Sequence, residues 1–288
     1  MSFLVSNVKC PLQKNWQFTC LSFFSENVNT HKSTGNFNFK LPTQFNKERF
    51  IENGGKYVNK NCKTDQNVAI IIPYRNRREH LQTFIDYIHP YLIQQNAINY
   101  QVFVIEQDDL LPFNRGNLLN IGYFEALQLN PDLNCFIFHD VDILPSDLRQ
   151  LYTCSHIPRH LCSYLDKFRY VLLYPELFGG AIAIHKEQFA HTNGYSNEYS
   201  GWGGEDDDFF YRVKHNFGYI ERYSKSIGRC RMLSHHPNNE LSESREELLQ
   251  NVSTRALKDG LTSLNQTYVL KQIEYFPSYV KVKVSLHS

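Results

Sequence analysis

The sequence predicts an α/β fold in which parallel strands are joined by helices. Three apolar runs of strand length, residues 68–74, 101–107 and 135–142, alternate with two segments whose apolar residues recur at helical spacing. Alternation of strand and helix indicates parallel βαβ units. The runs are apolar almost throughout, so we expect the sheet to be covered on both faces.

Each element has its own signal in the sequence. The first strand, VAIIIPY, contains Pro73 near its end, and the second is QVFVIEQ. The third, CFIFHDVD, is apolar until it reaches its two acids. Between the first two strands, Leu81, Phe84 and Ile85 recur at helical spacing, and RGNLLNIGYFEAL (115–127) predicts the second helix.

The organisation expected is a long extension followed by one domain. Residues 1–65 are polar and weakly periodic, so we expect a stem-like, partly irregular segment, with a single domain over 66–288. No apolar run reaches the roughly 18–20 residues that a membrane helix needs. The first residues also lack a clear basic region. The chain as given is therefore expected to be soluble, without a membrane anchor, unless it is a fragment of a longer protein.

Charge and cysteine content exclude several classes of protein. The net charge is +1 and no long run of like charge occurs, which argues against a nucleic-acid surface. The short cluster Arg75, Arg77 and Arg78 fits a small anion better than a polymer. None of the seven cysteines forms a CxxC pair, which argues against a zinc ribbon and leaves disulfides or buried thiols open. Sequons at Asn251 and Asn265 are permissive for a secretory route.

Polar side chains follow two of the predicted strands. Asp140 and Asp142 end the third strand, where one carboxylate can hold Mg²⁺ or Mn²⁺ and the other a ribose or a metal-bound water. Arg75 and Arg77 follow the first strand and can fork onto phosphate oxygens. Ligands bind beyond the carboxyl ends of strands in open α/β sheets, so these groups should converge on one edge. Taken singly, an Asp-x-Asp in a surface turn or an ordinary surface arginine is the competing interpretation.

The segment GWGGEDDD (201–208) combines a hinge, an aromatic ring and four acids. Glycine allows hinge motion, and Trp202 offers a flat apolar face to a sugar ring. The acids precede FFYRV, a predicted helix start, where the helix dipole favours carboxylates. A solvated loop would explain the acids but not the Trp-Gly-Gly. Further along, Met232 and His235 alone would not justify a metal site, because such residues more often belong to a core or a surface.

Taken together, these segments closely resemble the animal β-1,4-galactosyltransferase family, which includes invertebrate β-1,4-N-acetylgalactosaminyltransferases. The resemblance extends from about residue 62 to the C-terminus. It is carried by IIPYRNRREHL (71–81), PFNRGNLLNIG (112–122), FHDVD (138–142), DKF (166–168), LFGG (177–180), GWGGEDDD (201–208), GRCRM (228–232) with His235, and DGLTSL (259–264).

The resemblance implies the type A glycosyltransferase fold, a Rossmann-like mixed sheet flanked by helices. It implies an inverting enzyme that moves GalNAc or Gal from UDP-GalNAc or UDP-Gal in β-1,4 linkage to a GlcNAc-terminated glycan. The cofactor would be Mn²⁺, held by Asp142, Met232 and His235, a donor set that suits Mn²⁺ better than Mg²⁺. Asp206 would be the general base, and Glu205 and Asp207 would hold sugar hydroxyls.

The remaining site residues implied by the resemblance fall into two groups. Those expected to bind the donor are Pro73, Tyr74, Arg75, Arg77, Phe113, Arg115, Asp140, Lys167, Leu177 and Trp202. Those expected to bind the acceptor are Gly204, Asp207, Arg245 and Leu249. Trp202 would lie on a mobile loop that closes over the donor and then helps to form the acceptor site.

Three positions depart from the familiar members of the family. Leu177 stands where vertebrate galactose-specific members carry Tyr, and the smaller residue should admit the N-acetyl group of UDP-GalNAc. The competing interpretation is that Leu177 is core packing in a galactosyltransferase. Glu246 and Ser200 replace aromatic residues near the acceptor.

The resemblance also implies two disulfides and a compartment. Cys135 would pair with Cys154 and Cys62 with an N-terminal cysteine, Cys10, while Cys230 would be buried and unpaired. Bridged cysteines and the family indicate the Golgi lumen. Two other functions stay open: a catalytically silent module that binds UDP-sugar or glycan, and a metal-dependent hydrolase of nucleotide sugars.

Overall fold

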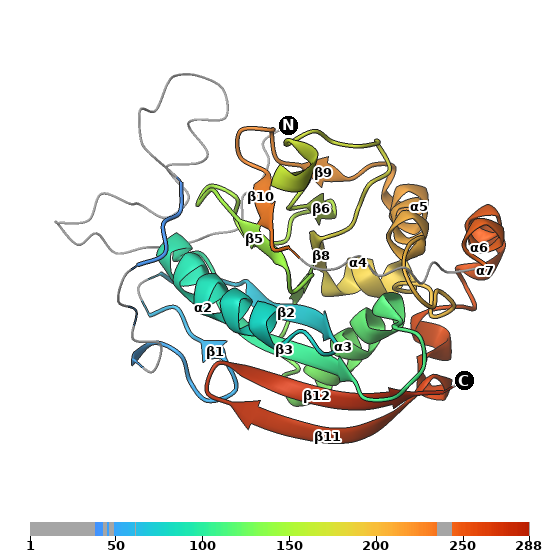
Figure 1. Ribbon diagram of the computed structural model, residues 1–288, viewed down its shortest axis with the longest axis horizontal. Helices are drawn as coiled ribbons and strands as arrows, with labels where there is room; N and C mark the ends of the chain where they lie inside the picture. The colour runs from blue at the N-terminus through green and yellow to red at the C-terminus, as the bar shows by residue number, and fades with distance from the viewer. Residues whose placement is uncertain (1–37, 43–44, 46–48, 61, 235–243, 288) are drawn as a thin grey trace.

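The computed structural model describes residues 38–42, 45, 49–60, 62–234 and 244–287 (Figure 1). Cys10 and His235 lie outside these residues. No helix in the described part of the chain combines the length and apolarity needed to cross a membrane.

A central mixed sheet organises the described residues. Its strands follow the order β11-β12-β3-β2-β4-β8-β6-β9, and β1 also pairs with β3. The bounds are β1 (Lys56–Tyr57), β2 (Asn67–Tyr74), β3 (Asn99–Gln107), β4 (Cys135–His139), β6 (Arg159–His160), β8 (Ala181–His185), β9 (Glu221–Arg222), β11 (Tyr268–Phe276) and β12 (Tyr279–Leu286). The predicted parallel arrangement is confirmed, because β2 pairs in parallel with both β3 and β4.

Helices cover both faces of this sheet, as the apolar strands predicted. Helix α2 (Arg78–Gln95) packs on the side chains of alternate β2 residues such as Ile70 and Ile72. Helix α3 (Arg115–Leu129) packs on the opposite face, over Ala69 and Ile71. The approach of α3 is close: a Cβ added at Gly122 would lie 2.3 Å from Ile71 Cγ2. Figure 1 shows α2 and α3 next to β2 and β3.

The third predicted strand ends earlier than expected. β4 stops at His139, and Asp140 to Asp142 form the turn that leads into β5 (Ile143–Pro145). A fully buried strand offers no solvent or partner for two carboxylates, so the chain leaves the sheet before them. Asp140 and Asp142 therefore lie in a turn and not on the strand that the sequence predicted for them.

Beside the central sheet stands a small sheet with the order β5-β10-β7. β10 (Arg229–Met232) is its central strand and pairs antiparallel with β5 and parallel with β7 (Tyr164–Leu165). The turn η2 (Asp166–Phe168) follows β7 directly. The remaining elements are α4 (Lys186–His191), α5 (Glu205–Phe217), α6 (Arg245–Gln250), α7 (Val252–Arg255) and η3 (Leu261–Gln266).

Two segments far apart in the sequence, β1 and the C-terminal hairpin, meet on β3. The C-terminal hairpin β11–β12 joins the central sheet through β12, which runs parallel to β3 and buries Val280, Val282 and Val284 completely. β1 pairs with the beginning of the same strand. Ile51 and Tyr57 are buried in the core, so part of the predicted extension packs on the sheet. The division of the chain at residue 65 stays a prediction.

Three disulfides involve described cysteines. Cys135 and Cys154 are bonded with their Cα atoms 5.7 Å apart, as the resemblance implies. Cys62 is also disulfide-bonded, and Cys10, its predicted partner, lies outside the described residues. The expectation that Cys230 is unpaired is wrong, because it is bonded to Cys162 with a Cα separation of 5.5 Å. The parallel pairing of β7 with β10 brings these two cysteines together.

Candidate active site

Polar side chains converge at the carboxyl ends of β2 and β4, as predicted. These strands are neighbours and parallel, so Arg75 and Asp140 lie beyond the same edge of the sheet. Arg115, the first residue of α3, donates from Nε to Asp140 Oδ1 over 2.7 Å. The FNR and FHDVD segments are therefore joined by a charged hydrogen bond.

The segment before α3 is held by Arg75 and by the helix cap. Arg75 donates from Nη1 to the carbonyl of Leu111 at 2.6 Å, and its guanidinium lies 5.3 Å from the centre of the Phe113 ring. Asn114 caps α3 by accepting from the Asn117 amide at 2.9 Å. The carbonyl of Phe113 accepts from the Gly201 amide at 2.9 Å, which attaches the Gly-Trp-Gly-Gly segment to this part of the site.

Arg115 is the charged centre of the site. Besides Asp140, its guanidinium contacts Glu205 Oε1 at 3.5 Å. Burial disfavours its charge, but Asp140, Tyr195 and Glu205 outweigh that effect and raise the pKa of Arg115. It therefore remains a cation that connects the start of α3, the end of β4 and the start of α5.

Helix α5 begins at Glu205, four residues before the predicted FFYRV start, so the whole acidic run forms its first turn. The N-terminal dipole favours carboxylates at these positions. The cap, Gly204, has φ +100°, a conformation that glycine adopts without strain. Trp202, just before it, is 60% exposed and available for stacking.

Three of these acids hold protons more tightly than usual. Burial and the neighbouring Asp206 raise the pKa of Glu205 to about 7, and Glu205 Oε2 has no hydrogen-bond partner among the residues that the structure describes. Burial also raises the pKa of Asp206. Burial and Asp206 raise the pKa of Asp207 to about 6, and the Tyr174 hydroxyl donates to its Oδ1 at 3.0 Å. Clustered, buried carboxyl groups with raised pKa values are typical of general acid–base sites.

The LFGG segment approaches Asp206 closely. A Cβ added at Gly179 would lie 2.4 Å from Asp206 Oδ2, so only glycine leaves room for this carboxylate. Leu177 is half-buried, and its carbonyl accepts from Arg222 Nη2 at 2.9 Å. Leu177, which the resemblance implies selects the donor, is therefore two residues from Gly179, whose backbone lies close to Asp206.

Sequence reasoning missed the role of the fourth acid. Asp208 is completely buried and accepts hydrogen bonds from Arg212 Nε at 2.6 Å, from Arg255 and from the Tyr199 hydroxyl. Arg212 and Arg255 also bond to Asp259 of the DGLTSL segment. The sequence did offer one signal for this contact, because EDDD and DGLTSL both belong to the segments that match the family. Asp208 anchors α5 to the C-terminal part of the chain.

Two of the three predicted metal ligands are adjacent. Met232 on β10 lies opposite Ile143 on β5, and the Leu233 amide donates to the Asp142 carbonyl at 2.7 Å. No group of three His, Cys, Asp or Glu able to hold a metal occurs among the described residues. His235 is outside them. A carboxylate and a thioether on neighbouring segments, beside Asp140, fit the donor set expected for Mn²⁺.

The other predicted residues lie around this centre. Pro73 and Tyr74 end β2, Arg77 caps α2, and Lys167 is exposed in η2. Arg245 packs on the acidic segment: a Cβ added at Gly204 would lie 2.8 Å from Arg245 Cγ. Leu249 is half-buried in α6, while Glu246 and Ser200 are exposed.

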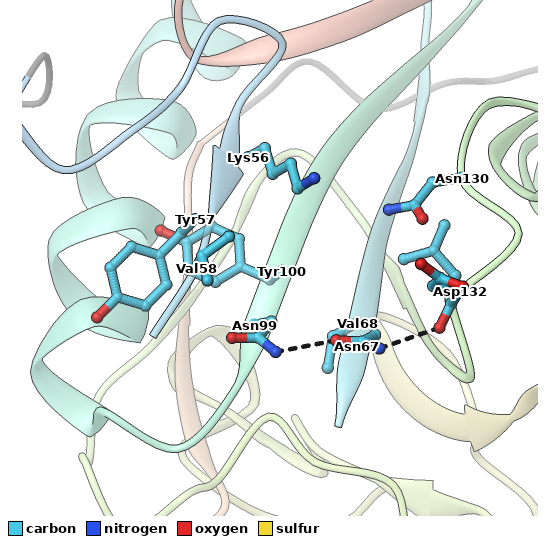
Figure 2. Close-up of a pocket in the computed structure, with 10 residues that line it drawn as sticks. Lys56, Tyr57, Val58, Asn67, Val68, Asn99, Tyr100, Asn130 and Asp132 are labelled. Carbon is cyan, nitrogen blue, oxygen red and sulfur yellow. Dashed lines mark hydrogen bonds between the residues drawn. The ribbon is translucent and has the colours of Figure 1, made fainter. Parts of the chain in front are cut away.

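A pocket lies at the opposite end of the strands from the acidic cluster (Figure 2). It is lined by Lys56, Tyr57, Val58, Asn67, Val68, Asn99, Tyr100, Asn130, Asp132 and Leu133. Asn67 donates to the Asp132 carbonyl at 3.1 Å and accepts from Asn99 Nδ2 at 2.9 Å. These amides bond to each other and to backbone, so this pocket is a weaker candidate than the acidic cluster.

Family comparisons cover most of the chain. The model described as the N-terminal region of glycosyl transferase group 7 matches residues 20–155, and that described as the N-terminal domain of galactosyltransferase matches residues 159–236. Mouse β-1,4-galactosyltransferase 1 is 42% identical over 238 residues, which are 82% of this chain and 59% of the relative. Rat β-1,4-galactosyltransferase 4 is 42% identical over 232 residues, 80% of this chain and 66% of the relative. The chain spans about three fifths of the first of these relatives.

A solved structure extends the likeness to the fold. The catalytic domain of Drosophila β-1,4-galactosyltransferase 7 superimposes with a TM-score of 0.66 and 25% identity, covering 77% of this chain and 95% of that one. A variant of the same protein, with the same scores, was solved in complex with manganese, UDP-Gal and xylobiose. The fold is that of the type A glycosyltransferases.

Proposed function

Because this chain belongs to the β-1,4-galactosyltransferase family, we propose that it is an inverting, Mn²⁺-dependent hexosyltransferase. It transfers GalNAc or Gal from a UDP-sugar in β-1,4 linkage to a GlcNAc-terminated glycan. The observation that carries this proposal is the cluster of protonatable carboxyls on α5, held beside the Arg115–Asp140 pair at the sheet edge.

The proton transfer is assigned to Asp206. Its carboxylate accepts the proton of the acceptor 4-hydroxyl as that oxygen attacks the anomeric carbon from the face opposite UDP, so one displacement inverts the configuration. Burial raises its pKa, which makes it a better base than an exposed aspartate. Glu205 and Asp207, its neighbours, hold hydroxyls of the two sugars.

The donor is held by residues at the strand ends. Pro73, Tyr74, Arg77 and Phe113 contact the nucleotide in this proposal, Arg75 and Arg115 face its anionic part, and Asp140 accepts from ribose. Asp142, Met232 and His235 would hold Mn²⁺, which would supply Lewis-acid neutralisation of the UDP leaving group. Lys167, which is exposed in η2, adds a positive charge near the phosphates of the UDP leaving group in this proposal.

The acceptor is held on the other side of the acidic helix. The exposed ring of Trp202 stacks on a sugar, and Gly204 and Asp207 line the adjoining surface. Arg245 and Leu249 on α6 contact the N-acetyl group. Arg245 already packs on Gly204, which supports this assignment.

The choice of donor is assigned to Leu177, and GalNAc is favoured over Gal. Leu177→Tyr adds bulk beside the donor C2 substituent and should shift preference from UDP-GalNAc towards UDP-Gal. The measurement is kcat/KM with each donor for both proteins. An unchanged ratio would refute this assignment and leave Leu177 as packing.

The test of the function itself is release of UDP with Mn²⁺ and a GlcNAc acceptor. Turnover should require acceptor, Mn²⁺ and Asp206, so Asp206→Asn should be nearly inactive. Free sugar released equally fast without acceptor would favour a hydrolase. Tight UDP binding that ignores Mn²⁺, with no turnover, would favour the silent binding module. The disulfides support the Golgi lumen as the compartment.

A further inference from the structure

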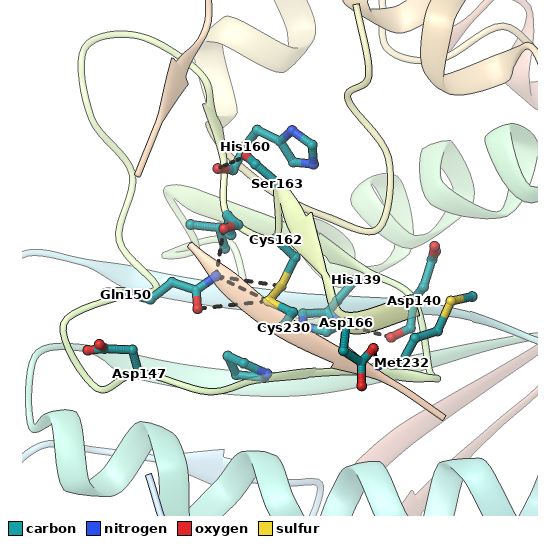
Figure 3. Close-up of a disulfide and its surroundings, with 12 residues drawn as sticks. His139, Asp140, Asp147, Gln150, His160, Cys162, Ser163, Asp166, Cys230 and Met232 are labelled. Carbon is teal, nitrogen blue, oxygen red and sulfur yellow. Dashed lines mark hydrogen bonds between the residues drawn. A yellow bond between two sulfur atoms is a disulfide. The ribbon is translucent and has the colours of Figure 1, made fainter. Parts of the chain in front are cut away.

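We propose that the Cys162–Cys230 disulfide and Asp166 are positioning residues for the metal site, which together hold Met232 and Lys167 in fixed relation. This inference rests on the proposed function, because it concerns the Mn²⁺ ligand assigned there. Figure 3 shows Met232 and Asp166 beyond the disulfide, towards the end of β10 and near Asp140.

Met232 is the last residue of a short strand that needs external support. β10 has four residues and lies between two short strands, β5 and β7. Cys230 precedes Met232 by two residues, so their side chains leave the strand on the same face. A covalent bond at Cys230 therefore restrains the backbone that directs the Met232 thioether.

The other half of the disulfide lies on the segment that carries Lys167. Cys162 comes just before β7, which continues directly into η2. β7 contributes only two residue pairs to its ladder with β10, at Arg229–Tyr164 and Cys230–Leu165. So few ladder bonds form a weak attachment, and the disulfide strengthens it at the same position.

Asp166 makes the second connection between the two segments. Its Oδ1 accepts from the backbone amide of Met232 at 2.9 Å and from the amide of Lys167 at 2.8 Å. A single carboxylate oxygen thus joins the proposed metal ligand to the proposed phosphate-facing lysine. Hydrogen bonds of a carboxylate to backbone amides are among the stronger ones in proteins.

The disulfide is enclosed, so it acts as permanent structure rather than as a switch. Cys162 is 2% exposed and Cys230 is fully buried. Gln150, also fully buried, donates from Nε2 to the Leu161 carbonyl at 2.6 Å and lies 3.4 Å from Cys230 Sγ. Solvent and soluble thiols have no access to it in the folded protein.

The experiment measures Mn²⁺ affinity directly, by titration followed with electron paramagnetic resonance and in the absence of donor. Cys162→Ala/Cys230→Ala should weaken the Mn²⁺ Kd about tenfold or more, the usual effect of losing the residues that orient metal ligands. The matched control is Cys135→Ala/Cys154→Ala, which removes a disulfide of similar Cα separation that is not attached to β10. The control should change Kd less than about twofold, within ordinary variation among variants.

Asp166 supplies an independent variant. Asp166→Ala should weaken Mn²⁺ binding and raise the KM for the donor, whereas Asp166→Asn keeps an accepting oxygen and should restore most of the affinity. If the double cysteine variant does not fold, as judged by circular dichroism, the two Asp166 variants decide. A Mn²⁺ Kd that is unchanged both in folded Cys162→Ala/Cys230→Ala and in Asp166→Ala would overturn this inference but not the proposed function. Failure of the wild type to bind Mn²⁺ would overturn the proposed function instead.

Discussion

Gly179→Ala tests whether the location of the Asp206 carboxylate matters for the reaction. The added methyl would lie 2.4 Å from Asp206 Oδ2, whereas ordinary contacts begin at 3.4 Å, so the carboxylate must move by about 1 Å. A displacement of that size at a reacting group costs about 10²-fold in rate. The backbone tolerates alanine, because Gly179 is not among the residues with positive φ.

The effect on stability should be small by comparison. The clashing oxygen is the end of a rotatable side chain, so relief by rotation should keep the loss within about 1–3 kcal/mol. The assay is kcat with saturating UDP-sugar and GlcNAc acceptor, together with a thermal melt. Gly228→Ala serves as the control, since its nearest neighbour is Tyr223 Cβ at 3.2 Å and its φ is also ordinary. A folded Gly179→Ala protein with kcat within threefold of wild type would refute the assignment of Asp206 as base.

Three further outcomes follow from the same site. In metal-free protein the folded pKa of Glu205, about 7, exceeds its ordinary 4.5, so the folded state binds more protons between these pH values and stability falls as pH rises through them. Urea denaturation at pH 5 and pH 8 should show a smaller decline for Glu205→Gln, and an equal decline would contradict the pKa shift. Asp208→Asn breaks a fully buried ion pair and should cost roughly 3–5 kcal/mol of unfolding free energy in the same assay, and a loss under about 1 kcal/mol would contradict it. When free Mn²⁺ is present at 100 times its Kd, removing it with a chelator should lower the free energy of unfolding by about 2.7 kcal/mol. A melting temperature that chelation does not change, or that chelation changes equally in Asp142→Ala, would count against the metal site.

The central strands were predictable because their signals are local. The apolar runs at 68–74 and 101–107 correspond to β2 and β3, and the helical spacing between them corresponds to α2. The end of β4 was placed too late, because its acids continue the run in sequence but lie in a turn. The position of β12 depends on its pairing with β3, more than 170 residues away in the chain, although the Val–Lys alternation in 279–286 marks it as a strand.

The site was predictable in its residue types but not in its contacts. Resemblance and motif position identified Asp206, yet only the fold places Gly179 against it. Likewise, nothing local distinguishes Asp208 from the three acids before it, although it alone is fully buried in ion pairs. Cys162 belongs to no matching motif, and only the pairing of β7 with β10 reveals it as the partner of Cys230.

The place of β12 has a consequence for how the protein is made. β2, β3 and β4 leave the ribosome long before residues 279–286 do, so the outer side of β3 at residues 103–107, beyond its pairing with β1, has no partner for most of synthesis. Such an unpaired, apolar edge invites association with other nascent chains. Maturation in the cell should therefore depend on chaperones that shield this edge until translation has delivered the final hairpin.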